Sequence, residues 1–281
     1  MPKQLADGSI LENRYVIEDK IGNGGMSNVY LVWDNKLSKR WAMKQIRLSE
    51  WKKVSFYREM ELLKRVSYPA FPVMVDWFME EEFGYLVMEW IQGETLEQFL
   101  QRKKRMDEAF ANKVMAEVMD ALSYLHSLVP AVIYGDLKPS NIILQRDGRV
   151  RMVDFGTACI GDDGCYMGTK GYAAPEFFAK MGVRPDVRSD IYSLGVVYYE
   201  VLTGKRFLGD YIENPFLSWQ IREVIFNCTR VSPKKRYESI QAVRDAMNQQ
   251  GKIPKRKQFL LRDCEKVILT ETNLAVWANS D

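Results

Sequence analysis

The sequence predicts an α+β fold with two lobes: a five-stranded antiparallel sheet with one helix, followed by a mainly helical lobe. Three observations lead to this prediction. Runs rich in β-branched and aromatic residues fill the first ninety positions, apolar residues at three- and four-residue spacing dominate after residue 94, and one later segment is apolar nearly all round. With 281 residues, 47% of them apolar, the chain can fill a substantial core.

The first lobe is predicted over about 15–90, after an N-terminal extension at 1–14. Its strands are expected at 15–21, 27–33, 40–46, 73–79 and 84–90. Short connections between the first three favour an antiparallel meander. Residues 50–66 are expected to form a helix, because five residues recur on one face: Phe56, Glu59, Leu62, Leu63 and Val66.

The second lobe is predicted over about 94–250. Within 107–127 a helical apolar stripe is formed by Phe110, Val114, Val118, Leu122 and Leu125. Residues 189–202 predict a central buried helix with Ser189 or Asp190 as its N-cap. The C-terminal extension, 251–281, combines the basic run KIPKRK with apolar residues. We expect it to pack on a lobe or to bind a second copy or a regulator.

Composition excludes several classes of function. The net charge is only +3 and the charges are mixed in sign, so nucleic acid is not an expected partner. No apolar run approaches the ~18 residues that span a bilayer, and the N-terminus lacks an apolar signal core, which favours a cytoplasmic protein. One histidine and four cysteines without a C-x-x-C pair disfavour a Cys/His zinc site.

A glycine-rich turn and an ion pair point to polyphosphate binding. Glycines 22, 24 and 25 lie between two predicted strands, where the backbone can approach phosphate oxygens closely, although an ordinary hairpin explains the turn alone equally well. Lys44 lies on an apolar strand, and Glu59 lies on an apolar helix face where an unpaired carboxylate would be costly. We infer a Lys44–Glu59 ion pair that leaves Lys44 free to reach the phosphates of a nucleotide.

From about 15 to 250 the chain resembles the protein kinase family, and most closely the bacterial serine/threonine kinases. Seven motifs carry the resemblance, in order: Gly22-x-Gly24-x-x-Ser27-x-Val29, WAMK, the helix glutamate Glu59, YGDLKPSN, DFG at 154–156, APE at 174–176 and SDIYSLG at 189–195. The resemblance implies a serine/threonine protein kinase that uses ATP and Mg²⁺, with Mn²⁺ as an alternative ion, and acts on protein hydroxyls.

The resemblance also implies roles for individual residues. Asp136 would accept or orient the attacking hydroxyl, Lys138 would contact the γ-phosphate, and Thr169 would contact Asp136 beside a Ser/Thr substrate. Asn141 and Asp154 would hold the metal ion. The nucleotide would be bound by a larger set: Ile21, Gly22, Asn23, Gly24, Gly25, Met26, Ser27, Asn28, Val29, Ala42, Lys44, Glu59, Met88, Glu89, Ile91, Ile143 and Asp154.

The main departure from the family pattern is Tyr134-Gly135, where most kinases have His-Arg. In those kinases the arginine binds a phosphate on the activation segment. Gly135 cannot do so, and we therefore expect activity that does not wait for that phosphate. Tyr134 replaces a histidine that packs on the DFG phenylalanine, and its ring is expected to fill the same space against Phe155.

Two other functions compete with this interpretation. Small-molecule phosphotransferases of the aminoglycoside or choline kinase type share a Gly-Asp loop, but they have no use for the peptide-binding shelf that DFG, APE and SDIYSLG predict. A non-enzymatic scaffold would be favoured by loss of Lys44, Asp136, Asn141 or Asp154. All four are present.

Overall fold

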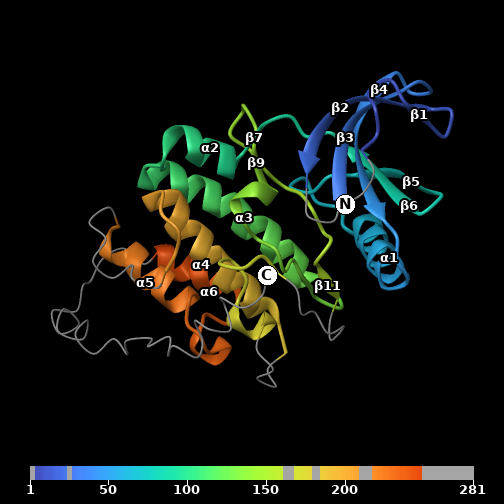
Figure 1. The fold of residues 1–281 in the computed structure, drawn as a ribbon. Coiled ribbons are helices and arrows are strands. Elements are labelled where there is room, and N and C mark those ends of the chain that lie inside the picture. The colour runs from blue at the N-terminus through green and yellow to red at the C-terminus, as the bar shows by residue number, and fades with distance from the viewer. Residues whose placement is uncertain (1–3, 24–26, 161–167, 179–183, 209–216, 249–281) are drawn as a thin grey trace, which may run out of the picture.

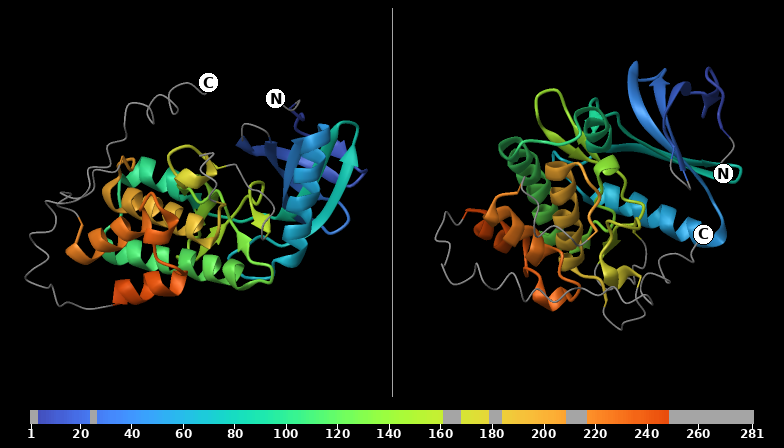
Figure 2. Two further views of the ribbon diagram at one scale, coloured as in Figure 1. Left: turned by 90° about the horizontal axis from the view of Figure 1, so that it is seen from below. Right: turned by 60° about the vertical axis from the view of Figure 1, so that its left-hand side comes forward.

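The computed structural model describes residues 4–23, 27–160, 168–178, 184–208 and 217–248 (Figure 1). A strand-rich lobe and a helical lobe lie side by side in all views (Figures 1 and 2). This arrangement confirms the predicted α+β fold with two lobes. No helix within the described ranges combines the length and the apolar character needed to cross a membrane.

The first lobe is built on one antiparallel sheet in the order β1-β2-β3-β4-β6-β5. Its strands are β1 (Ile10–Leu11), β2 (Tyr15–Asn23), β3 (Ser27–Asp34), β4 (Lys39–Arg47), β5 (Met74–Glu80) and β6 (Phe83–Glu89). All five predicted strands are present. The sheet has a sixth strand as well, because Ile10 and Leu11 of the predicted extension pair with Val16 and Tyr15.

Helix α1 (Glu50–Arg65) packs against one face of this sheet (Figure 1). Its buried side chains include Phe56, Leu62 and Leu63, which the helical pattern had placed on one face. Glu59 is buried with them, only 3% exposed. The helix therefore places a carboxylate in an apolar interface. A buried carboxylate of this kind is tolerated only with a cationic partner.

The second lobe is mainly helical. Its helices are α2 (Leu96–Lys103), α3 (Glu108–Ser127), α4 (Val187–Thr203), α5 (Trp219–Cys228) and α6 (Ile240–Asn248). This lobe also contains short strands in two small sheets, β10-β9-β7 and β11-β8: β7 (Glu94–Thr95), β8 (Val132–Ile133), β9 (Ile142–Leu144), β10 (Val150–Met152) and β11 (Cys159–Ile160). Single 3-10 turns occur at η1 (Pro139–Asn141), η2 (Pro175–Phe177) and η4 (Pro233–Lys235).

Helix α4 is the buried helix that the sequence predicts, but its predicted cap is wrong. The helix begins earlier, and the N-cap is Asp186, whose carboxylate accepts a hydrogen bond from the Arg188 N–H at 2.8 Å. Ser189 is the third helical residue, and its hydroxyl accepts from the Asp186 N–H in a capping box. The Asp190 carboxylate is engaged outside the helix, so it is not available as a cap.

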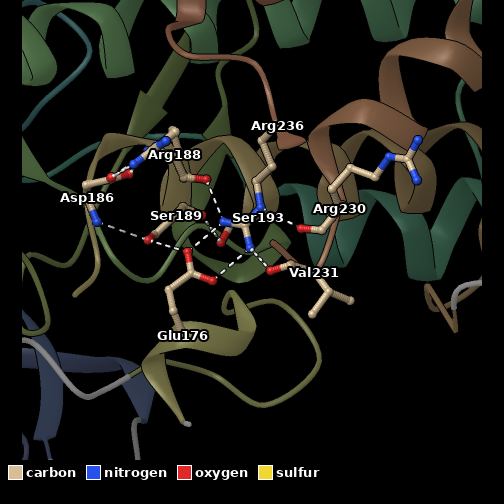
Figure 3. Close-up of polar contacts among 8 residues, drawn as sticks. All are labelled: Glu176, Asp186, Arg188, Ser189, Ser193, Arg230, Val231 and Arg236. Carbon is tan, nitrogen blue, oxygen red and sulfur yellow. Dashed lines mark hydrogen bonds and ion pairs between the residues drawn. The ribbon is translucent and has the colours of Figure 1, made fainter. Parts of the chain in front are cut away.

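A buried ion pair ties the APE motif to Arg236, which lies between η4 and α6 (Figure 3). Arg236 donates to both carboxylate oxygens of Glu176, at 2.6 and 2.7 Å, and neither side chain is more than 3% exposed. The remaining guanidinium N–H groups donate to the backbone carbonyls of Arg188, Arg230 and Val231. All five guanidinium N–H groups thus have partners, which is the condition under which a buried arginine is tolerated.

We expect Arg236→Leu to lower the free energy of unfolding by about 3–5 kcal/mol, because it leaves the Glu176 carboxylate buried without its cation. Urea denaturation followed by far-UV circular dichroism measures this change. Arg149→Leu is the matched control, since that arginine is 72% exposed in its pair with Asp147, and its midpoint should equal that of the wild type. Equal midpoints for both variants would contradict a stabilising role of the Arg236–Glu176 ion pair.

Candidate active site

Three charged side chains from different elements meet where the two lobes join. Lys44 of β4 donates to Glu59 Oε1 of α1 at 2.6 Å and to Asp154 Oδ1, after β10, at 2.7 Å. The Lys44–Glu59 ion pair inferred from the sequence is therefore present. Burial alone would lower the pKa of Lys44, but the charges of Asp154 and Glu59 outweigh burial and raise it. The lysine remains charged.

Asp154 is the more open member of this group. Its side chain is 43% exposed, against 9% for Lys44 and 4% for Glu59. Burial of the group acts to raise the pKa of Asp154, but the charge of Lys44 and its hydrogen bond lower the pKa overall. The backbone adopts φ +72°, which is uncommon for a residue other than glycine and is held by the Gly156 N–H donating to Oδ1 at 3.1 Å.

A second cluster surrounds Asp136. Its Oδ2 accepts from Lys138 Nζ at 2.7 Å, and its Oδ1 accepts from the Thr169 hydroxyl at 2.6 Å and the Thr169 N–H at 3.0 Å. Lys138 also donates to the Thr169 hydroxyl at 2.8 Å. The carboxylate, the ammonium and the hydroxyl that the sequence singles out are thus in direct contact, although Thr169 lies 33 residues from Asp136.

Asn141 and Asp154 suit a hard cation. The Asn141 amide nitrogen donates to the backbone oxygen of Asp136 at 2.9 Å and to its Oδ2 at 3.1 Å, so the amide oxygen is left for another partner. Oδ2 of Asp154 has no hydrogen bond within the described residues. Two oxygens of this kind, with phosphate and water completing the shell, are the usual protein contribution to a magnesium site.

Asp190 holds the backbone of the loop that carries Asp136. It is fully buried in α4 and accepts from the N–H groups of Tyr134 at 2.8 Å and Gly135 at 2.9 Å. His126 Nε2 lies 2.9 Å from the same carboxylate. The carboxylate of a long helix therefore fixes the loop two residues before Asp136, and the single histidine supports this anchor.

Tyr134 fills the space beside the DFG phenylalanine, as the sequence predicts. Its ring meets Phe155 edge to face at 5.7 Å between centroids, and Phe71 meets Phe155 at 5.1 Å from another direction. The Tyr134 hydroxyl also donates to the backbone oxygen of Val153, next to Asp154. A histidine in this position would not offer that phenol, so the tyrosine both packs on the motif and binds the backbone directly before it.

Gly135 has a conformational role that the sequence did not reveal. Its φ is +78°, and a Cβ added there would lie 2.9 Å from the backbone oxygen of Thr157. Both the left-handed backbone and the close approach favour glycine. The loop packs so closely on the segment after DFG that a larger residue at position 135, such as the usual arginine, would not fit without a rearrangement.

Some of the expected nucleotide-binding residues lie on strands β2, β3, β4 and β6 of the first-lobe sheet. In the strand register Val29 pairs with Lys44, and Ala42 pairs with Met88. Gly22 lies close to Val29, with 3.2 Å from a hypothetical Cβ to the Val29 Cβ, and Ile21 is 44% exposed. Asn23 is the last residue of β2 and Ser27 is the first residue of β3. Between them, Gly24, Gly25 and Met26 of the glycine-rich loop lie outside the described residues.

Two of these residues have side chains committed to the scaffold. Asn28 is 3% exposed and donates to Gln45 Oε1 at 3.1 Å, so only its backbone is available to a nucleotide. Glu89 is held by Arg151 of β10, whose Nη1 donates to Oε1 at 3.0 Å and whose Nη2 also contacts Phe71 O at 3.1 Å. Arg151 thus fixes the segment leading to Ile91, a contact that sequence analysis missed because no local pattern links β10 to β6.

The protein kinase domain family matches residues 15–266 of this chain. The serine/threonine-protein kinase PknB of Mycobacterium tuberculosis is 33% identical over 258 residues, 85% of this chain and 39% of the relative. PknB of Mycobacterium leprae is 32% identical over 255 residues, 84% and 39%. A probable myosin light chain kinase of Dictyostelium discoideum is 31% identical over 258 residues, 82% and 81%. The chain spans about two fifths of the length of the mycobacterial relatives.

We expect Gly135→Ala to lower the free energy of unfolding by about 2–4 kcal/mol, because it adds both left-handed strain and a clash with Thr157 O. Gly148→Ala is the matched control: its φ is +86°, but nothing lies within 4 Å of its hypothetical Cβ. That variant should lose only the strain, about 1 kcal/mol. Equal losses in urea denaturation would show that the close approach to Thr157 is unimportant.

Proposed function

This chain belongs to the protein kinase family, and on that premise we propose that it transfers the γ-phosphate of ATP to serine and threonine hydroxyls of proteins. The observation that carries the proposal is the contact set Asp136–Lys138–Thr169 beside the Lys44–Glu59–Asp154 group. The first set can orient a hydroxyl and the second can hold phosphates. The bacterial relatives are serine/threonine-protein kinases, which supports the same substrate class.

Each residue of these clusters then has a defined task. Asp136 orients the substrate hydroxyl or accepts its proton. Lys138 places a positive charge at the transferred phosphate. Lys44 binds the α- and β-phosphates while Glu59 fixes its ammonium. Asn141 and Asp154 would hold Mg²⁺, which would supply positive charge to neutralise the phosphates. Thr169 holds Asp136 on the side where the substrate hydroxyl arrives.

We propose that adenine binds where the segment after β6 connects the two lobes. Ile21, Val29 and Ala42 form one wall of the slot and Ile143 of β9 the other. Backbone groups of Glu89 and Ile91 bind the edge of the base, with Met88 at its inner end. The Arg151–Glu89 ion pair supports this arrangement, because it holds the backbone of Glu89 in place before a nucleotide binds.

We further propose that activity does not depend on a phosphate bound through residue 135. Gly135 offers no cation, and the loop is already held by Asp190 and the Tyr134–Phe155 contact. The described hydroxyls of the neighbouring segment are also unsuitable for modification. The Thr157 hydroxyl is buried, the Thr169 hydroxyl binds Asp136, and the Tyr172 hydroxyl donates to Glu200 at 2.6 Å.

We expect Asp136→Asn to reduce kcat for phosphate transfer to a basic protein substrate by about 10²–10⁴-fold, because the hydroxyl loses its proton acceptor. Transfer of label from radioactive ATP measures the rate, and thermal melting checks the fold. Asp147→Asn, an exposed change elsewhere, should retain full activity. Nucleotide binding without transfer in the wild type would instead favour a scaffold, and transfer only to small molecules would favour the small-molecule phosphotransferases.

Phosphatase-treated protein should phosphorylate its substrate at an initial rate within about twofold of the untreated protein, because no arginine precedes Asp136. Thr157→Val, which keeps the shape of the side chain and removes a buried hydroxyl without a partner, should also be active and no less stable. The proposal would be overturned if the wild type shows a lag that disappears as the protein phosphorylates itself, while Thr157→Val stays at the low initial rate.

A further inference from the structure

A row of polar side chains is buried on the face of the first-lobe sheet opposite to that of Lys44. Asn28 of β3 and Tyr85 of β6 each pair with Gln45 of β4 in the strand register. The three side chains are only 3%, 2% and 1% exposed, in that order. Neighbouring residues of a strand point to opposite faces, so Gln45 points away from the site that its neighbour Lys44 enters. We call Asn28, Gln45 and Tyr85 the polar row.

Hydrogen bonds join the polar row across the strands. Gln45 Oε1 accepts from the Asn28 side-chain amide at 3.1 Å, and Gln45 Nε2 donates to the Tyr85 hydroxyl at 3.3 Å. The Tyr30 hydroxyl of β3 is also buried and donates to Gln45 Oε1 at 3.5 Å. Both ends of the Gln45 amide are therefore bonded, and a displacement of any member would leave a buried polar group without a partner.

The surroundings of the row are apolar. Tyr30 and Tyr85 belong to a buried cluster on the same face of the sheet, which also contains Ile17, Val32 and Met43. Water has little access to side chains in such a cluster, so it cannot readily replace a partner that moves away. The polar row is thus a specific contact between β3, β4 and β6 within a face that otherwise packs through apolar side chains.

The polar row lies beside the glycine-rich loop. Asn23, the last residue of β2, pairs with Asn28, and the ladder between β3 and β4 ends at the next rung, where Ser27 pairs with Ile46. β2, β3 and β4 lie next to one another in the sheet (Figure 1). The ends of strands open more easily than their middles. A buried side-chain bond next to the last rung therefore holds β3 in place where the loop joins it.

The N-terminal segment, residues 5–11, supports the row. The Leu5 N–H donates to the Tyr30 hydroxyl at 3.0 Å, and this hydroxyl in turn donates to Gln45. The segment is fixed to the sheet because its strand β1 pairs with β2. It precedes the match to the protein kinase domain family, which covers 15–266. The contact therefore adds a support that lies outside the matched residues.

We propose that Gln45 is a positioning residue for the nucleotide: through Asn28 it holds β3 beside the glycine-rich loop, and through Tyr30 it connects β3 to the N-terminal segment. The inference rests on the nucleotide binding proposed above. A loop with fixed ends loses less conformational freedom when it closes on phosphates, so the row raises the affinity for nucleotide. The transfer step is unaffected, because Asp136 and Lys138 hold each other within the second lobe.

Titration with fluorescent N-methylanthraniloyl-ADP and Mg²⁺ tests the proposal without phosphate transfer. Gln45→Met keeps the length of the side chain and removes both hydrogen-bonding groups, so we expect the Kd for this nucleotide to rise about tenfold. The KM for ATP should rise in parallel, while kcat at saturating ATP stays within about twofold of the wild type. Far-UV circular dichroism at the assay temperature checks the fold.

The outcomes separate this inference from the proposed function. An unchanged Kd in folded Gln45→Met would overturn the inference, and so would a reduced kcat with an unchanged Kd. A wild type that binds nucleotide without transferring phosphate would contradict the proposed function, but the Kd comparison would still decide the inference. A wild type that binds no nucleotide would overturn both.

A matched pair of tyrosine variants separates positioning from stability. Tyr30→Phe removes the hydroxyl between Leu5 and Gln45 and should raise the Kd about threefold. Tyr15→Phe is the same change in the same cluster, but this hydroxyl donates to Asp76 at 2.6 Å. It should lower the melting temperature at least as much and leave the Kd unchanged. Equal Kd values for the two variants would refute the proposal, and this pair decides the question if Gln45→Met does not fold.

Discussion

The buried carboxylate of Asp190 is the constraint on which the site depends. A charge without solvent exposure is tolerated only when its lone pairs are satisfied, and here they are satisfied by the backbone of the loop before Asp136 and by His126. The loop cannot shift without leaving that charge unsatisfied. The buried helix α4 of the second lobe thus fixes the position of a loop that has little regular structure of its own.

The same principle connects the lobes. Glu59 of α1 is buried, and its charge is compensated by Lys44, which also reaches Asp154 of the second lobe. Arg151 links the second lobe to the end of β6 through Glu89. The energy of an ion pair falls with the distance between its charges, so these contacts hold only when helix, sheet and loop keep their relative positions. The site is thus held in position by ion pairs between elements, because no single element supplies both partners of any of these pairs.

Local periodicity explains what could be predicted from the sequence. The five strands and α1 follow from alternation and helical spacing, and the Lys44–Glu59 pair follows from two charges on apolar faces. Three features could not be found this way. Strand β1 is only two residues long, the cap at Asp186 competes with equally plausible caps three and four residues later, and the Arg151–Glu89 contact joins positions 62 residues apart. Each depends on tertiary packing that no short window of sequence encodes.

The left-handed backbone at Gly135 has an evolutionary consequence. An arginine at this position would need room that the Thr157 carbonyl occupies, so the loop and the segment after DFG would have to change together. A single substitution toward the common kinase pattern would first pass through a less stable protein. Gly135 and the close packing around it are therefore epistatic, because neither can change toward the common pattern without a change in the other.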